Sequence, residues 1–461
     1  MYDPNLHLLA DNDELTHHWN LTRTIGRPER SVRPLLQADR PWEGEQIACW
    51  GTVVHDPTDG LFKIWYQTWI EDFPATTHVS RSVVCYAQSR DGLTWEKPNL
   101  GVTTYQGSTD HNVVYTVEDF DEPHQLDCFA VLHEPEDPDP ARRFKMLAWV
   151  ERIPRVDKIQ MGFISLFSAD GIRWTRHPGY TIPRLGDRMG CYHDVIRGRY
   201  VMNSRQAWRN LRNHLPTKRQ VAMAESTDFV EWTEARSIIK MDDDDGMDDQ
   251  FYGLTPFVWG NQYLGHLEVY HRATEHLDVH LVTSRDGEHW SRPAQRDPFL
   301  ARGPDGAWDE TWVAFTSNPP IVHGDEMWLY YDGRRGGHPP ISPPARRHGA
   351  VGLARTKRDR FAGLTAGIQE GEAVTERILA GAPRFLVNLN ARCGEVAVAV
   401  YDAEGDPVEG YGRADCTVVS GDQVDAEITW NGANLGPMEG REVYLRFWIR
   451  YGTLYAYRFS S

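Results

Sequence analysis

A short turn motif recurs along the chain and constrains the fold more than any other feature of the sequence. Its form is Ser-x-Asp-Gly-x-x-Trp, and four copies lie at 89–95, 168–174, 226–232 and 284–290, the third with Phe in place of Gly. A degenerate fifth copy occupies 356–361. An Asp side chain can accept hydrogen bonds from the N–H groups of a tight turn, Gly readily adopts a positive φ, and Trp can pack back on a sheet. The recurrence therefore predicts one structural unit repeated five times.

Three strand-like segments precede each turn, and a short one follows it. In the first unit the three segments are 47–56, 61–69 and 83–88, and they alternate apolar with polar residues or are rich in aromatic residues. Units of this kind form four-stranded antiparallel sheets, and five of them in succession are typical of a five-bladed β-propeller. Few segments have helical periodicity, so we expect an all-β fold.

The sequence divides into two regions with different strand patterns. The predicted blades extend over 46–98, 112–178, 187–235, 248–293 and 307–362. We expect residues 1–45 to wrap the propeller and help to close its ring, so that 1–362 forms one domain. Beyond about residue 372 the strands alternate regularly and are separated by Gly, Asn and Asp turns, which predicts a C-terminal β-sandwich over 372–461.

Charge and hydropathy argue against several classes of partner. The net charge is −17, with 49 Lys and Arg against 66 Asp and Glu, whereas nucleic acids and anionic membrane surfaces both require basic patches. No apolar run approaches the roughly 18 residues of a transmembrane helix. The first residues lack a basic segment followed by an apolar run, so we predict no signal peptide and expect a cytoplasmic location.

The sequence has no motif for a cofactor or a catalytic metal. The six Cys show no CxxC spacing, and there is no HExxH, Gly-rich phosphate loop or GxSxG. We therefore expect no cofactor. The acidic run Asp242–Asp245 could hold a structural Ca²⁺, but it lacks the Asp-x-Asp-x-Asp-Gly spacing and is better explained as a solvated loop.

Acidic residues gather where each predicted blade begins. The innermost strand of a propeller blade starts at one mouth of the central channel, where loops and strand ends are free to carry function. We therefore expect an acidic ring at this mouth. Its candidate catalytic members, in chain order with one from each blade, are Glu45, Asp127, Asp187, Asp249 and Glu310.

Cleavage of a glycosidic bond needs a set of acids of this kind. One carboxylic acid protonates the leaving oxygen, and a second carboxylate acts as a nucleophile or activates water. Crowded acids raise one another's pKa, which keeps one of them protonated near neutral pH. Asp127 is the candidate for an orienting or stabilising carboxylate, and the acid and base are to be found among Asp187, Asp249 and Glu310, with Glu45 as the blade-one member. A structural role as a turn acid or strand cap is the alternative for each.

Aromatic and basic residues lie beside these acids. An aromatic ring could stack on the face of a sugar, and a His or Arg could donate hydrogen bonds to hydroxyls or a carboxylate. The candidates for substrate binding are Trp50, His193, Arg205, Tyr252, His271 and Trp312. Packing within the sheets explains these residues equally well.

The sequence resembles the five-bladed propeller glycoside hydrolases, families 32, 43, 68 and 130 among them. The resemblance is carried by the repeated turns, the hairpin over 54–67 and the terminal strand 443–447. It is closest to family 32-like proteins, in which a β-sandwich follows the propeller. The resemblance implies a glycosidase acting on a carbohydrate such as a furanoside or a small oligosaccharide, and it matches Asp127 to the Asp of the family's Arg-Asp-Pro motif.

Two other functions stay open at this point. A glycoside phosphorylase similar to family 130 would need a basic cluster to hold phosphate, for which the candidates are Arg205, Arg209 and Arg212. A non-catalytic sugar-binding propeller is favoured by the lack of an Asp in 45–51, where family 32 enzymes carry one.

Overall fold

The computed structural model describes most of the chain. It describes residues 1–461 except 45, 70–81, 119, 122–123, 153–160, 184, 210–215, 294–295 and 338–347. The described residues form strands, with single turns of 3-10 helix at η1 (Pro41–Glu43), η2 (Pro140–Arg142) and η5 (Gly436–Met438). The predicted all-β fold is confirmed. Among the described residues, no helix has the length and apolar character needed to cross a membrane.

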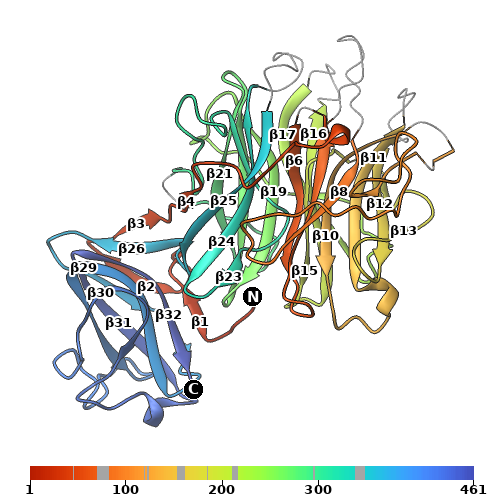
Figure 1. Cartoon of the computed structure of the whole chain (residues 1–461). Helices are drawn as coiled ribbons and strands as arrows, with labels where there is room; N and C mark the ends of the chain where they lie inside the picture. The colour runs from red at the N-terminus through yellow and green to blue at the C-terminus, as the bar shows by residue number, and fades with distance from the viewer. Residues whose placement is uncertain are drawn as a thin grey trace.

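Three antiparallel sheets follow one another along the chain in the larger part of the molecule (Figure 1). The first contains β6 (Gln46–His55), β7 (Phe62–Trp69), β8 (Val84–Ser89) and β9 (Val113–Tyr115). The second contains β10 (His124–His133), β11 (Phe144–Arg152), β12 (Met161–Ser168), β13 (Thr175–Arg176) and β14 (Ile182–Pro183). The third contains β15 (Met189–Asp194), β16 (Arg199–Arg209), β17 (Pro216–Ser226) and β18 (Arg236–Ile239).

A further sheet of nine strands combines two sections. One section contains β19 (Asp249–Trp259), β20 (Gln262–His271) and β21 (His276–Ser284). The other contains β22 (Trp312–Phe315), β23 (Ile321–His323), β24 (Glu326–Arg335) and β25 (His348–Lys357), together with β4 (Glu29–Arg30) and β5 (Leu36–Gln37). The two sections meet at a parallel pairing of Leu277 with Trp312. The described residues thus form as many antiparallel sections as the sequence has repeats.

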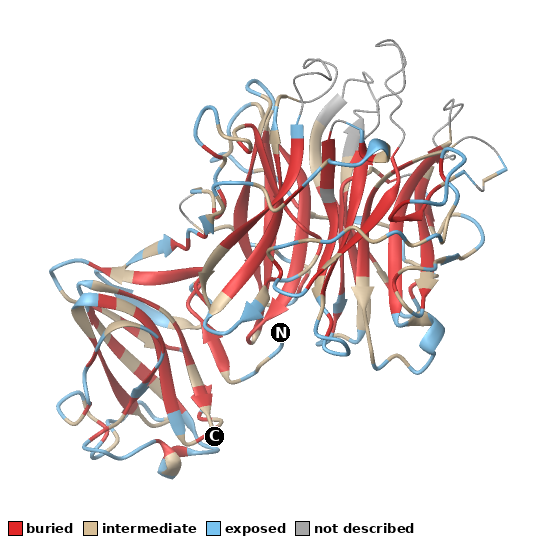
Figure 2. Cartoon of the chain, in the orientation of Figure 1, coloured by how far each residue is buried: buried red, intermediate tan, exposed pale blue. Residues whose placement is uncertain are grey.

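The sections close into a ring. Strand β6 packs against β10, β10 against β15, and β15 against β19, while β6 also packs against β22, β24 and β25 of the last section. A ring of antiparallel sheets with their first strands innermost is the architecture of a β-propeller. Figure 2 shows these strands buried along most of their length, because each sheet is covered on both faces by its neighbours.

The smaller part of the molecule is a ten-stranded sheet, drawn mostly in blue at the C-terminal end in Figure 1. From the C-terminal segment it contains β26 (Ala362–Ala366), β27 (Gly371–Thr375), β28 (Ile378–Leu379), β29 (Arg384–Tyr401), β30 (Val419–Ile428), β31 (Glu442–Arg450) and β32 (Gly452–Ser460). The long strand β29 pairs with β30 and β32 along its first half and with β31 along its second. The sheet therefore folds over a core of its own, which includes Phe385, Trp430 and Tyr457.

The N-terminal segment contributes strands to both parts, which differs from its expected role as a wrap around the propeller. Strand β1 (Leu6–Leu8) pairs with β32, β2 (Leu15–Trp19) with β27, and β3 (Thr22–Ile25) with β26. Strands β4 and β5 pair instead with β25 of the propeller. The C-terminal sheet also begins at β26, earlier than the predicted residue 372. Both ends of the chain therefore meet in one sheet, which ties the smaller part to the ring.

The repeated turns have the hydrogen bonds that the sequence predicts. In the first turn, Ser89 Oγ accepts the N–H of Gly92 over 2.9 Å, and Asp91 Oδ1 accepts the N–H groups of Leu93 and Thr94 over 2.8 and 2.7 Å. These backbone donors lower the pKa of Asp91 to about 2. The third turn keeps the pattern with Phe229 at a φ of 66°, in the conformation that Gly adopts in the other three.

Removal of one turn carboxylate should destabilise the fold, and more so at neutral than at acidic pH. A lowered pKa stabilises the folded state above the ordinary carboxyl pKa, and this contribution is lost as the pH falls through the folded value. Asp91→Ala should therefore reduce the free energy of unfolding by about 1 kcal/mol at about pH 7, as loss of a backbone cap does, and by less at about pH 3. Urea unfolding measures both values. The matched control is Asp243→Ala in an exposed loop, and an equal loss in the control would contradict the capping role.

Candidate active site

Asp127 is held at an irregularity in β10. Cys128 has a φ of 42° and shifts the β10–β11 register between Asp127 and Phe129. The Gln67 side chain donates a hydrogen bond to Asp127 Oδ1 over 2.7 Å and accepts the Cys128 N–H over 2.9 Å. The Cys128 N–H also reaches Asp127 Oδ1 over 2.8 Å. The bulge thus fixes one carboxyl oxygen, while Oδ2 accepts no hydrogen bond from any described residue.

Asp187 supplies a second carboxylate next to Asp127. Its Oδ1 forms an ion pair with Arg205 of β16. The same oxygen accepts a hydrogen bond from the backbone N–H of Arg188 over 2.7 Å. Burial and the neighbouring Asp187 carboxylate raise the pKa of Asp127 to about 6. Asp127 is therefore protonated at mildly acidic pH, whereas the charge of Asp187 is balanced by a guanidinium. Two predicted acids from different blades are thus brought together in different electrostatic environments.

Three of the predicted aromatic residues form one cluster. Trp50 of β6, Tyr252 of β19 and Trp312 of β22 have ring centroids 5.1–6.2 Å apart. Their exposed fractions are 3%, 3% and 2%, so they form a buried floor rather than open stacking platforms. Tyr270 extends the floor, with its ring centroid 5.6 Å from those of both Tyr252 and Trp312. Three sections of the ring therefore share this floor.

Guanidinium groups lie over these rings. Arg334 Cζ is 4.1 Å from the Trp50 ring centroid, Arg205 Cζ is 4.8 Å from that of Tyr252, and Arg219 Cζ is 5.2 Å from that of Tyr252. Arg188 also lies over Trp50, at 5.6 Å. We refer to Asp127, Asp187, the four arginines and the three rings Trp50, Tyr252 and Trp312 as the Asp127 group.

Three of these arginines were missed by sequence reasoning. Arg188, Arg219 and Arg334 have no local motif that separates them from surface arginines. The one available signal is the alternation Asp332-x-Arg334, which places both side chains on one face of β24, where they form an ion pair at 2.7 Å. Another ion pair joins Arg188 to Glu268, with Arg188 Nε 2.8 Å from Glu268 Oε2. Both side chains are almost fully buried.

Two other predicted residues bind each other rather than Asp127. His271 Nδ1 lies 2.6 Å from Asp249 Oδ1, and its Nε2 lies 3.4 Å from Asp278 Oδ2. His280 Nε2 completes the chain at 2.9 Å from Asp278 Oδ1. The hydrogen bond to Asp278 raises the pKa of His271 to about 9. Asp249 and His271 thus belong to a charged chain across β19, β20 and β21.

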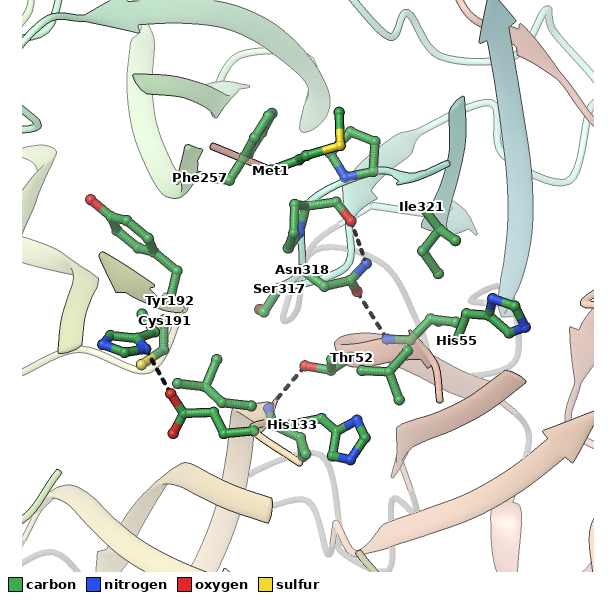
Figure 3. Close-up of a pocket in the computed structure, with 18 of the residues that line it drawn as sticks. Met1, Thr52, His55, His133, Cys191, Tyr192, Phe257, Ser317, Asn318 and Ile321 are labelled. Carbon is green, nitrogen blue, oxygen red and sulfur yellow. Dashed lines mark hydrogen bonds and ion pairs between the residues drawn. The ribbon is translucent and has the colours of Figure 1, made fainter. Parts of the chain in front are cut away.

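Glu310 and His193 are engaged elsewhere. Glu310 accepts a hydrogen bond from the N–H of Gly306 and pairs with the Arg335 guanidinium, 3.0 Å away. Both contacts lower the pKa of Glu310, and they hold the loop around it in place. His193 lies near the end of β15 and pairs with Glu134 Oε1 at 2.7 Å. It lines a cavity of about 580 Å³, together with Met1 and Phe257 (Figure 3). Because β15 starts near Asp187 and ends near His193, this cavity lies at the opposite end of the channel from the Asp127 group.

The remaining predicted residues are neutralised or fall outside the described part of the chain. Asp242 lies 3.0 Å from Arg292 and 2.6 Å from Arg296, and Asp245 pairs with Arg292, so two arginines bind the two ends of this acidic run. Within the described ranges, no group of three or more His, Cys, Asp or Glu could hold a metal ion. The residues outside the description are Glu45, Arg212 and the side chain of Arg209.

Comparison with known proteins identifies similar folds. No protein-family model and no curated protein matches the sequence. A solved glycoside hydrolase is 13% identical with a TM-score of 0.51, and the match covers 72% of this chain and 92% of that one. A glycosyl hydrolase from Bacteroides ovatus is 12% identical with a TM-score of 0.50, over 73% of this chain and 95% of that one. The likeness is one of fold. It confirms the resemblance to propeller glycoside hydrolases at that level, and the closeness to family 32 stays a prediction.

Breaking the Arg188–Glu268 pair should destabilise the protein strongly. Arg188→Leu leaves the Glu268 carboxylate buried without its partner, so the free energy of unfolding should fall by about 3–5 kcal/mol. The double variant Arg188→Leu with Glu268→Leu removes both charges and should recover most of that loss. Urea unfolding of the wild type and the three variants, including Glu268→Leu alone, measures the coupling. Additive losses in the double variant would show that the two side chains do not depend on each other.

Proposed function

We propose that the protein is a glycoside hydrolase whose active site is the Asp127 group. The observation that carries this proposal is the difference between two neighbouring carboxyls. Burial and the Asp187 charge raise the pKa of Asp127 to about 6, while Asp187 is paired with Arg205. Glycoside hydrolysis requires one carboxyl that holds a proton and one that is anionic, and separation by environment is the usual way to obtain both.

In this proposal Asp127, for which the sequence suggested an orienting or stabilising role, is instead the acid that donates its proton to the glycosidic oxygen as the bond breaks. Its Oδ1 is fixed by Gln67 and the Cys128 N–H, which leaves Oδ2 to carry the proton toward the substrate. Asp187 supplies the anionic carboxylate, which stabilises the positive charge that develops on the sugar ring. A water molecule then forms the new bond to the anomeric carbon and gives a proton to the ionised Asp127, which restores the starting state. Arg205 then holds Asp187 in place through its ion pair.

The surroundings of the two carboxyls support the same function. The buried rings of Trp50, Tyr252 and Trp312 support the arginines that lie over them, and these arginines supply hydrogen-bond donors for the hydroxyl groups of a sugar. Solved structures with the same fold are described as glycoside hydrolases, which supports a carbohydrate substrate.

Replacement of the proposed acid should affect substrates according to their leaving group. Asp127→Asn cannot donate a proton, so kcat on a responsive 4-nitrophenyl glycoside should fall by about 100-fold or more. The loss should be smaller on the matching 2,4-dinitrophenyl glycoside, because that leaving group departs as an anion without an acid. The wild-type rate should decline as the pH rises through about 6, where Asp127 loses its proton, and the variant should lack this decline. Initial rates across pH measure both effects.

Three results would contradict the proposal. A loss below about tenfold in Asp127→Asn, with Asp243→Asn as the matched control, would exclude Asp127 as the acid. Tight sugar binding without turnover on a broad glycan panel would indicate a non-catalytic propeller. A rate that depends on added inorganic phosphate, with release of a sugar phosphate, would indicate a phosphorylase.

A further inference from the structure

The arginines of the Asp127 group do not all have a carboxylate partner. The pairs are Arg188 with Glu268, Arg205 with Asp187, and Arg334 with Asp332. Arg219 forms no ion pair with any residue that the structure describes. Asp127 in turn forms no ion pair with a described cation. The group therefore contains one arginine and one acid whose charges are not balanced by a direct partner.

Arg219 is positioned by uncharged contacts. Its Nη1 donates a hydrogen bond to Gln250 Oε1 over 2.9 Å, and its Cζ lies 5.2 Å from the Tyr252 ring and 5.5 Å from the Tyr270 ring. Arg205 lies over the same Tyr252 ring, at 4.8 Å. Burial and the neighbouring Arg205 charge lower the pKa of Arg219. Two guanidiniums thus lie over one ring, and only Arg205 is paired with a carboxylate.

We propose that Arg219 binds the carboxylate of an acidic sugar, so that the substrate is a glycoside containing a uronic acid. This inference rests on the proposed glycosidase function. The planar guanidinium can donate two parallel hydrogen bonds to a carboxylate, a geometry that neutral hydroxyls do not offer. A bound carboxylate would also offset the repulsion between Arg219 and Arg205 and the cost of burying an unpaired charge.

The number of unpaired charges favours a sugar carboxylate over inorganic phosphate. A phosphate group carries about −1.5 to −2 charges near neutral pH and calls for more than one cation. Arg205 and Arg334 already have carboxylate partners, so Arg219 alone is available, and it balances a single negative charge. A uronic acid brings that one charge on a ring whose hydroxyl groups can accept hydrogen bonds from the neighbouring arginines.

The test compares matched substrates that differ in one carboxylate. The probes are 4-nitrophenyl glucuronides against glucosides and galacturonides against galactosides, in both anomeric forms. Wild-type enzyme should prefer the acidic member of at least one pair by about tenfold or more in kcat/KM. Arg219→Gln should lower kcat/KM for that acidic member by about 100-fold, mainly through KM, and lower kcat/KM for the neutral member by a clearly smaller factor, about tenfold or less, because a hydroxyl loses only a neutral hydrogen bond. For the acidic substrate, kcat/KM of Arg219→Lys should lie between the values of the wild type and Arg219→Gln.

The matched control removes an arginine charge away from the site. Arg236→Gln on β18 loses a half-exposed guanidinium that pairs with Glu288 at 2.9 Å, and it should behave like the wild type. Equal losses on acidic and neutral substrates in Arg219→Gln would overturn the inference and leave the glycosidase function standing. The inference would also be overturned if Arg219→Gln changed only the dependence of the rate on inorganic phosphate, because phosphate would then be the anion that Arg219 binds.

A binding measurement separates this inference from the proposed function. If no glycoside is turned over, titration calorimetry with free glucuronate and galacturonate against glucose and galactose decides the question. Binding of an acid that is lost in Arg219→Gln and kept in Arg236→Gln would support the carboxylate site even though the hydrolase proposal fails. Absence of any preference for the acids in the wild type would overturn it.

Discussion

Contacts between a turn of one section and an aromatic ring of the next hold the propeller closed. Trp65 donates its indole N–H to the carbonyl of Gly171 over 2.7 Å, and the Tyr330 hydroxyl donates to the carbonyl of Gly92 over 2.8 Å. A Cβ at Gly171 would lie 2.6 Å from the Trp65 ring, so the turn needs Gly there for space as well as for its φ of 74°. These contacts join the first section to the second and the last section to the first. The site depends on them, because its residues come from several sections.

The Asp127 group shows how burial acts on the charges of ordinary side chains. Charged groups taken out of water need partners, and Arg188, Arg205 and Arg334 each have a carboxylate. Asp127 has none and responds by holding its proton to a higher pH. Arg219 cannot respond in the same way, because a guanidinium stays charged in proteins. An acid that keeps its proton and a cation that keeps its charge are the features that a substrate can use.

Local patterns were predicted well from the sequence, and contacts between distant segments were not. The repeated turns are determined within seven residues, so their fold could be anticipated. The pairing of β1 with β32 joins residues at opposite ends of the chain, and nothing local indicates it. Asp127 and Asp187 were found because both lie where an inner strand begins. His193 was misplaced because it lies toward the far end of its strand.

The arginines were harder to predict for a geometrical reason. The predicted acids lie at or near the starts of innermost strands, whereas Arg219 and Arg334 lie on β17 and β24, outside the first strands of their sections. Glu310 was grouped with Asp127 and Asp187 by the same criterion, whereas its partners in the structure, Gly306 and Arg335, belong to a local loop. Position along a strand thus selects the channel end but not the side chains that meet there.

Asp127 keeps its proton to a pH well above the usual pKa of a carboxyl group. Infrared difference spectra between the wild type and Asp127→Asn, recorded across pH, isolate the C=O band of that one protonated carboxyl. We predict that this band disappears with a midpoint at about pH 6, because burial and the Asp187 charge raise the pKa of Asp127. A midpoint below about 4, the ordinary value for Asp, would contradict it.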